Sequence, residues 1–384
     1  MKIGFQIEHL DPARGGAETY VYRFGEQLLA NGHEVHFIAA SFGKSLPGAF
    51  THRIMLRGLT RWTQDLRFAR SADRAARRAK LDVVVATGRT YGANVLQPHG
   101  GTFRGSHRQN ILRLGGVTAK GLKRAFDAVN PRVIMQCAIE GAQYAADPPP
   151  QVVALSQMVR ADMKQFYNVP DERLHVIYNG VDLDRFDPKV CAAKREEARR
   201  ALGLQDAQTC FLLVGHNFRL KGLRELVKSA ARLKETDGAW RVVVVGKGNP
   251  RPYQRLTRSL GCGEWFVFPG AAADILPLYG ASDVCVLPTW YDPCSLVTLE
   301  ALACGRPVIT TRFNGAAELM EDGREGFLLS SPAGTVPLAH AMEQMLDADV
   351  RAAMGQAARR TAEEHPLARN FREMMAVFEA AAAR

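Results

Sequence analysis

The sequence predicts an α/β protein of two doubly wound domains, because strand-like and helix-like segments alternate along the chain. Near the start, an apolar strand at residues 2–7, a helix at 17–31 and a strand at 33–40 form a βαβ unit, which requires a parallel sheet. A second series of such units begins beyond residue 190. The length of 384 residues also favours two domains at about 150 residues each.

Turn chemistry between residues 179 and 188 marks the junction between the two series. We therefore expect a first domain over residues 1–182, a second over 183–365, and a final helix at about 366–384 that packs back on the first. Such sheets bind ligands beyond the carboxyl ends of their strands, so we expect the site where the two domains face each other across a cleft. Further strands are expected at 81–86, 94–97, 152–155, 174–178, 211–214, 241–245, 265–268, 284–287 and 307–311.

The positive charge of the chain is concentrated in its first half. The chain has 50 Lys and Arg residues against 39 Asp and Glu residues, a net charge of +11. Residues 1–180 hold 24 of the basic and 14 of the acidic residues, a net charge of +10. This asymmetry indicates a surface for an anionic partner in the first half. Nucleic acid is the less favoured partner, because no reader motif or aromatic platform accompanies the charge.

The seven cysteines form no Cys-x-x-Cys pair, which argues against a zinc site or a disulfide framework. Charged residues appear by Glu8, too early for a signal peptide, and no apolar run reaches the ~20 residues that span a bilayer. We expect a cytoplasmic protein with peripheral contact at the inner face of the cytoplasmic membrane.

The segment 292–300 carries the strongest chemical pattern, since it follows a strand and opens a helix. Asp292 stands where an N-cap would stand, and Pro293 at the first helical position. The next three amides would then be free to bind an anion. Glu300, in an apolar run, would lie on the same side of the helix as Asp292, although an N-cap and a solvated glutamate are the alternative interpretation. The three amides belong to Cys294, Ser295 and Leu296.

Residues 292–309 resemble the Glu-x7-Glu signature of the retaining glycosyltransferases of family 4, which have the GT-B fold. Their pattern is carboxylate-Pro-x-x-Leu-Val-x-Leu-Glu-Ala-x-Ala-Cys-Gly-x-Pro-Val-Ile. The spacing is kept, and Asp292 replaces the first Glu. The resemblance implies that Glu300 holds the ribose hydroxyls of a nucleotide sugar. It implies that Asp292 contacts hydroxyls of the donor sugar.

Other segments resemble the same family in the same order. Gly15-Gly16 resembles its glycine loop, whose amides face the donor phosphates and the acceptor. The stretch from Gly215 to Gly222 resembles the segment that supplies a basic pair to the diphosphate, here Arg219 and Lys221; His216 stands where an Arg is usual. The alternative for the two cations is a solvated turn. A late Asn-Gly turn at 314–315 also matches.

His99 follows the expected strand 94–97 and precedes two glycines. It resembles the first-domain histidine of the family that contacts the donor sugar, whereas a structural role is the alternative for an isolated histidine. The resemblance implies front-face displacement with the leaving phosphate assisting the acceptor hydroxyl, and needs no metal and no cofactor. We assign no general base.

A cationic helix face is expected within the basic stretch between residues 53 and 80. Its arginines recur at intervals of three and four, and the alternatives are a solvated face or contact with anionic lipid or a phosphorylated acceptor. In GT-B enzymes the first domain receives the acceptor, which fits the charge asymmetry. The face consists of Arg67, Arg70, Arg74 and Arg77.

These resemblances imply transfer of a hexose, with UDP-glucose as the leading donor, to a lipopolysaccharide, lipid or polysaccharide acceptor. The Phe-Arg-Leu-Lys-Gly stretch at 218–222 is most similar to the lipopolysaccharide-core glucosyltransferase I branch of the family. Two alternatives remain: a GT-B nucleotide-sugar epimerase, or a catalytically weak homologue that binds nucleotide sugar or membrane.

Overall fold

The computed structural model describes residues 1–56, 58–233 and 239–383. The chain divides into two compact units: residues 1–178 together with the C-terminal segment from Asn370, and residues 179–369. The sequence analysis drew this boundary after residue 182. Within the described ranges, the structure contains no helix long and apolar enough to cross a membrane.

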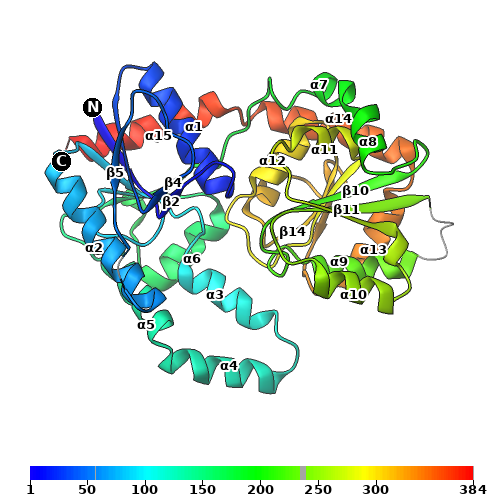
Figure 1. The fold of residues 1–384 in the computed structure, drawn as a ribbon, viewed down its shortest axis with the longest axis horizontal. Coiled ribbons are helices and arrows are strands. Elements are labelled where there is room, and N and C mark those ends of the chain that lie inside the picture. The colour runs from blue at the N-terminus through cyan, green and yellow to red at the C-terminus, as the bar shows by residue number, and fades with distance from the viewer. Residues whose placement is uncertain (57, 234–238, 384) are drawn as a thin grey trace. The chain divides into compact units, whose positions relative to one another are not determined.

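The first unit is built on a seven-stranded sheet with the order β5-β3-β1-β6-β7-β8-β9, and every pair of neighbours is parallel. Helices flank the sheet (Figure 1). A small parallel pair, β2 (His9–Leu10) and β4 (Ser41–Phe42), lies beside it. The strands are β1 (Lys2–Gln6), β3 (Glu34–Ala39), β5 (Phe50–Arg53), β6 (Val83–Ala86), β7 (Val95–Leu96), β8 (Gln151–Ala154) and β9 (Leu174–Val176). The helices are α1 (Gly16–Ala30), α2 (Arg61–Ala79), α3 (Phe103–Leu112), α4 (Val117–Val129), α5 (Pro131–Tyr144) and α6 (Gln157–Tyr167).

The last helix, α15 (Leu367–Ala382), completes the core of the first unit with the residues that follow Asn370. Phe378 packs against Phe5 of β1 and Phe24 of α1, with ring centroids 6.5 and 5.7 Å apart. All three rings are buried in one apolar cluster, so this helix is part of the fold of the unit rather than an appendage.

The second unit has a six-stranded parallel sheet with the order β12-β11-β10-β13-β14-β15. Its central strands read as continuous β-branched or apolar runs, as expected of strands buried on both faces. The strands are β10 (Thr209–Val214), β11 (Trp240–Val245), β12 (Phe266–Gly270), β13 (Val284–Leu287), β14 (Val308–Thr311) and β15 (Gly326–Leu329). The helices are α7 (Pro188–Ala193), α8 (Arg195–Ala201), α9 (Leu223–Ala230), α10 (Arg251–Ser259), α11 (Leu276–Ala281), α12 (Leu296–Ala303), α13 (Thr335–Gln344) and α14 (Ala348–Glu363).

The predicted α/β class with two parallel sheets is confirmed, and each strand expected from the sequence is present within a few residues. Four strands were not predicted from the sequence: β5 and β15, which lie at sheet edges, and the short pair β2 and β4. The pattern of β5, Phe-Thr-His-Arg, has exposed or half-buried side chains throughout, so it lacks the apolar run that marks the central strands.

Candidate active site

The strand order of the second sheet reverses between β10 and β13, which is where doubly wound sheets bind their ligands. The loops that follow these strands span residues 215–222 and 288–295. They are joined at one carbonyl: Trp290 donates its backbone N–H to the oxygen of Leu220 at 2.8 Å, and the Thr289 hydroxyl donates to the same oxygen at 2.9 Å. The two loops therefore form one rigid unit at the switch point.

Lys221 and Asp292 form an ion pair across these two loops. Their side chains are only 19% and 11% exposed. The flanking glycines allow the approach. A Cβ on Gly215 would lie 2.7 Å from Cγ of Lys221, and one on Gly222, whose φ is 74°, would lie 2.0 Å from the carbonyl oxygen of Pro288. The structure thus brings the two predicted charged residues together, with the ammonium held by the carboxylate.

The predicted cap of α12 is wrong. The helix begins at Leu296, and its N-cap is Ser295, whose hydroxyl accepts a backbone N–H from the first turn at 3.4 Å. Asp292 lies three residues earlier, in an extended segment that forms a parallel bridge with Asn314. The Ser295 amide is not free, since it donates to Oδ1 of Asn314 at 3.2 Å. The strand-like pairing with the loop after β14 competes with helix formation here and delays the helix by one turn.

Asn314 organises the start of α12, a role that the sequence analysis did not assign. Its Oδ1 accepts from the backbone of Ser295 and of Ala316, and its Nδ2 donates to the hydroxyls of Thr298 and Thr310 at 2.9 and 3.1 Å. The residue is fully buried. A polar side chain directly after a buried strand, in an Asn-Gly turn, was the signal that could have identified it.

Glu300 lies on the second turn of α12 and is held by Tyr279 of α11. The Tyr279 hydroxyl donates to Oε2 of Glu300 at 2.8 Å and lies 3.2 Å from the carbonyl oxygen of Val297. Burial, and then the nearby Glu300 carboxylate, raise the pKa of Tyr279 well above its ordinary value, so the phenol remains a donor. Because the helix starts after Asp292, helical spacing does not relate Glu300 to Asp292, contrary to the prediction.

Arg219 is exposed in the loop after β10, and His216 lies in the same loop. Nδ1 of His216 accepts the backbone N–H of Lys247 at 3.2 Å. Burial, followed by Lys247 and Lys221, lowers the pKa of His216. Its imidazole is therefore neutral near pH 7, and the cationic charge of the loop comes from Arg219 and Lys221.

In the first unit, Gly15 and Gly16 stand at the start of α1. Gly15 is the N-cap in an extended conformation, and its carbonyl accepts the hydroxyl of Thr19 at 2.9 Å. This 15-residue helix has no side-chain cap hydrogen bond at its start, and its first turn contains one acidic residue, Glu18. The first-turn amides and the helix dipole make this end suitable for an anion.

His99 follows β7 and packs on Tyr20 of α1, with ring centroids 4.6 Å apart. Burial lowers the pKa of His99 to about 4, so the ring is neutral at physiological pH. Among the described residues, its buried Nε2 has no hydrogen-bond partner. Buried polar atoms are almost always paired, so this nitrogen is available to a ligand. The ring lies beside the helix that Gly16 opens.

The predicted cationic face is present on α2 as a row of exposed side chains. Arg77 donates to Oδ1 of Asp73 at 2.8 Å. The remaining members of the face are Arg67, Arg70 and Arg74.

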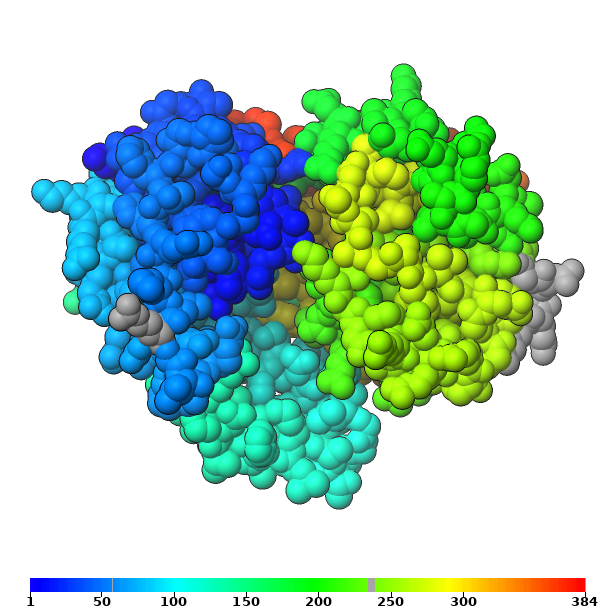
Figure 2. Space-filling model, in the orientation of Figure 1, coloured from blue at the N-terminus to red at the C-terminus, as the bar shows by residue number. Residues whose placement is uncertain are grey.

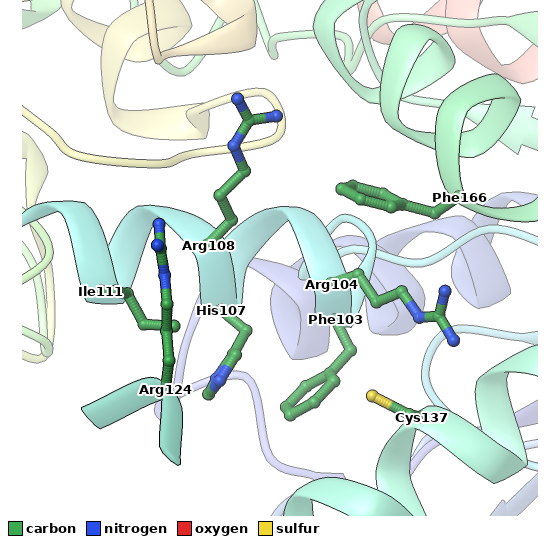
Figure 3. Close-up of a pocket in the computed structure, with 8 residues that line it drawn as sticks. All are labelled: Phe103, Arg104, His107, Arg108, Ile111, Arg124, Cys137 and Phe166. Atoms are coloured by element: carbon green, nitrogen blue, oxygen red, sulfur yellow. The ribbon is translucent and has the colours of Figure 1, made fainter. Parts of the chain in front are cut away.

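A cavity of about 300 Å³ lies in the first unit between α3, α4, α5 and α6. Its walls combine apolar side chains with three arginines and no carboxylate (Figure 3). Figure 3 shows Arg104 beside Cys137 and Arg124 beside Ile111. The lining residues are Phe103, Arg104, His107, Arg108, Ile111, Arg124, Cys137 and Phe166. The sequence analysis counted these arginines in the basic half but did not predict the cavity.

A metal-binding cluster of three or more His, Cys, Asp or Glu side chains does not occur in the part of the chain that the structure describes.

Two doubly wound parallel sheets are the architecture of the GT-B fold, and comparison with known proteins agrees. Residues 14–185 match the family model for glycosyltransferase family 4, and residues 208–348 match the model for glycosyl transferases group 1. Together these two matches cover more than half of the chain. The chain belongs to glycosyltransferase family 4, and the predicted GT-B fold is confirmed.

Several curated relatives are similar in sequence. An uncharacterized glycosyltransferase of Methanocaldococcus jannaschii is 32% identical over 44% of this chain and 44% of its own. D-inositol 3-phosphate glycosyltransferase 2 of Catenulispora acidiphila is 31% identical over 56% of this chain and 52% of its own. The chain thus spans about half the length of these two relatives. The lipopolysaccharide glucosyltransferase WaaG of Escherichia coli K12 is 24% identical over 92% of both chains.

Solved structures match the whole chain. The crystal structure of WaaG, a glycosyltransferase of lipopolysaccharide biosynthesis, has a TM-score of 0.83 at 22% identity and covers 99% of this chain and 98% of its own. HepE of Anabaena in complex with UDP-glucose has a TM-score of 0.75 at 20% identity, covering 99% of this chain and 100% of its own. At these identities the likeness establishes the fold.

Proposed function

We propose that the protein is a retaining, metal-independent glycosyltransferase that moves glucose from UDP-glucose to a lipopolysaccharide, lipid or polysaccharide acceptor. The ion pair between Lys221 and Asp292 at the switch point of the second sheet carries this proposal. This ion pair supports the proposal because it lies in the loops at the reversal of strand order, where doubly wound sheets bind their ligands. UDP-glucose is the proposed donor because the structural neighbour HepE was crystallised in complex with that molecule.

The leaving diphosphate gathers negative charge as the sugar bond breaks. Lys221 is already oriented by Asp292, so it does not need to reorganise during the reaction. Arg219, exposed in the same loop, supplies a second cation. Glu300, fixed by Tyr279, is proposed to accept the ribose hydroxyls. The amides of Cys294 and Leu296 are proposed to assist at the phosphates, whereas the Ser295 amide is used by Asn314.

The proposed step is a front-face displacement at the anomeric carbon. The bond from this carbon to the phosphate oxygen breaks, and a bond to the acceptor oxygen forms on the same face. The acceptor proton passes to the leaving phosphate. In the first unit, the unpaired Nε2 of His99 is proposed to contact the sugar, and the first turn of α1 at Gly15 and Gly16 the phosphates or acceptor.

The acceptor is proposed to be anionic and to bind the first unit. The cavity with Arg104, Arg108 and Arg124 supports this, because arginines over an apolar floor suit a phosphate or carboxylate on an amphiphile. The arginine face of α2 is proposed to add electrostatic attraction to anionic lipid, which amounts to about 1 kcal/mol per basic residue near a charged membrane.

A panel of nucleotide sugars screened by ligand-induced thermal shift tests the donor, and we expect the largest stabilisation from UDP-glucose. Turnover with labelled UDP-glucose and lipopolysaccharide or lipid extracts then tests transfer. Proton NMR of the product should show the α-anomer of the donor preserved, and EDTA should leave the rate unchanged. An inverted anomer would reject the retaining mechanism, and loss of activity with EDTA would reject metal independence.

The same assay separates the alternatives. An epimerase would convert UDP-glucose without acceptor and without releasing UDP. A homologue that only binds nucleotide sugar would give a thermal shift with UDP-glucose but no turnover. In that case Glu300→Ala would abolish the thermal shift, and neither wild type nor the variant would form product. Transfer that is abolished in Glu300→Ala supports the proposed function.

A further inference from the structure

Two buried cysteines of the second unit lie in direct contact. Sγ of Cys191 on α7 and Sγ of Cys304, the residue that ends α12, are 3.0 Å apart, and both are free thiols. They are 113 positions apart in the chain, so no local sequence pattern relates them. The sulfurs of a disulfide are about 2.0 Å apart, so these two need to approach by only about 1 Å to form a covalent bond.

The backbone segments that carry the two cysteines are held together by Arg359 of α14. Its Nη1 donates to the carbonyl oxygens of Ala303 at 2.9 Å and of Phe186 at 3.2 Å. Ala303 directly precedes Cys304, and Phe186 lies just before α7. The same guanidinium lies 3.7 Å from the carboxylate of Asp187, the N-cap of α7. The two sulfurs therefore meet without rearrangement of the chain around them.

The two thiols differ in acidity, which assigns them different roles in an oxidation. The hydrogen bond with Cys304 lowers the pKa of Cys191, while burial opposes this effect and the charge of Arg306 assists it. The same hydrogen bond, together with burial, raises the pKa of Cys304. Because the thiolate is the reactive form of a cysteine, Cys191 is the nucleophile of the pair and Cys304 the thiol that completes the bond.

Cys191 is covered by a short helix at the surface. Helix α7 has six residues, and Cys191 is its buried residue. The space-filling view shows the green segment around α7 at the surface of the second unit (Figure 2). Its exposed residues are Lys189, Val190, Ala192 and Ala193. A surface helix of this length opens locally more readily than a core strand, so a small oxidant can reach the sulfur during such an opening.

Both cysteines touch the elements that hold Glu300. Helix α7 packs on α11 at Gly280, where an added Cβ would lie 2.5 Å from the carbonyl oxygen of Cys191. Gly280 follows Tyr279, whose hydroxyl donates to Glu300 at 2.8 Å. On the other side, the backbone N–H of Cys304 donates to the carbonyl oxygen of Glu300 at 3.0 Å. Movement of the two sulfurs by about 1 Å therefore reaches both Glu300 and the tyrosine that orients it.

We propose that Cys191 and Cys304 form a reversible disulfide that lowers the affinity of the second unit for its nucleotide-sugar donor. This regulation rests on the proposed function for the identity of the donor, whereas formation of the disulfide does not depend on it. The bond would displace the last turn of α12 and, through α7, the neighbouring α11. The Glu300 carboxylate would then no longer be held in the orientation that suits the ribose hydroxyls.

The proposed oxidant is hydrogen peroxide. The Cys191 thiolate attacks one peroxide oxygen, the O–O bond breaks, and a sulfenic acid and hydroxide form. Sγ of Cys304 then attacks Sγ of Cys191, the S–O bond breaks, and a second hydroxide leaves. The two protons lost by the thiols convert both hydroxides to water, so two thiols are oxidised and one peroxide is reduced. A dithiol reductant reverses the bond by thiol–disulfide exchange.

The test is treatment of the folded full chain with hydrogen peroxide, followed by digestion without reductant and mass spectrometry. Wild type should give a cross-link between Cys191 and Cys304, and dithiothreitol should remove it. Isothermal titration calorimetry should give a Kd for UDP-glucose that is at least about fivefold higher for the oxidised chain than for the reduced chain.

Cys191→Ser and Cys304→Ser should each prevent the cross-link, and peroxide should then leave the Kd for UDP-glucose unchanged. Cys137→Ser is the matched control, because Cys137 lies in the first unit and is half-buried, whereas the other six cysteines are buried. It should form the cross-link as wild type does. Phenylarsine oxide, which bridges two adjacent thiols, tests the pair in the unsubstituted protein and should block the cross-link.

Two outcomes would overturn the proposal. In the first, peroxide leaves Cys191 and Cys304 unlinked in wild type, either as thiols or as separately oxidised residues. In the second, the cross-link forms but the Kd for UDP-glucose is the same in both states. Binding of UDP-glucose to the reduced chain is measured before oxidation, so failure of the proposed donor is seen separately from failure of the disulfide.

Discussion

The two units are both parallel α/β sheets flanked by helices, but they differ in how far their polar side chains are paired with protein groups. In the second unit, several charged and polar residues at the switch point are paired, as in Lys221 with Asp292 and Asn314 with the start of α12, whereas the buried Nε1 of Trp290 has no hydrogen-bond partner among the described residues. In the first unit, His99 presents a buried nitrogen that the described residues leave unpaired, and α4 turns its apolar side outward. The comparison indicates that contacts within the second unit fix most of its switch point, whereas the first unit presents groups that its described residues do not cover.

The largest expected effect concerns the fixed cation of the second unit. Lys221→Met should lower kcat/KM for transfer by about 100- to 1000-fold, because one preorganised group that neutralises developing charge is lost. Lys228→Met, on the exposed side of α9, is the matched control and should leave kcat/KM unchanged. A Lys221→Met enzyme within threefold of wild type would mean that the second unit is not preorganised around this ion pair.

The next effect concerns the buried asparagine. Asn314→Ala should lower the free energy of unfolding by about 2–4 kcal/mol, because the amides of Ser295 and Ala316 lose their acceptor inside the protein. Urea unfolding measures it. Asn249→Ala, an exposed asparagine that accepts one backbone N–H, should cost about 0.5 kcal/mol or less. Equal losses in the two variants would contradict the role given to Asn314.

Lowering the pH should reduce the stability of the first unit because His99 is buried as a neutral ring. Its pKa in the folded protein is about 4, below the ordinary 6.5, so the neutral ring favours the folded state above pH 6.5. This contribution is lost as the pH falls, by about 2 kcal/mol at pH 5 and about 3 kcal/mol at pH 4. The difference in stability between His99→Gln and wild type should therefore move in favour of the variant between pH 6.5 and 4. A constant difference across this range would show that His99 is not buried as a neutral ring.

The smallest expected effect is on α4. The combined substitution Leu122→Ser, Phe126→Ser and Val129→Ser on its outward face should change the free energy of unfolding by less than about 0.5 kcal/mol per site, since these side chains are exposed to water. Leu226→Ala on α9, a fully buried leucine of the second unit, should cost about 2–5 kcal/mol. If the α4 variant unfolds as easily as Leu226→Ala, the face is part of the core of the protein rather than an exposed surface.

The sequence by itself determined the fold class, the order of the central strands along the chain and the residues at the switch point. Apolar runs such as 241–245 and 284–287 identify buried parallel strands from local composition alone. The Glu-x7-Glu-like spacing identified the family, and the family match confirms it. Edge strands such as β5 were not predicted, because an exposed edge strand does not need the apolar run that marks a buried strand.

Only the tertiary structure decided which groups meet. The pairing of Lys221 with Asp292 joins residues 71 positions apart in the chain, and no local pattern encodes it. The start of α12 depends on Asn314, which lies in the turn after β14, so propensity at residues 292–296 placed the cap three residues too early. The outward face of α4 likewise depends on where Asp127 finds its partners. Long-range contacts fix these features because an ion pair or a capping hydrogen bond depends on distance in space rather than on separation in sequence.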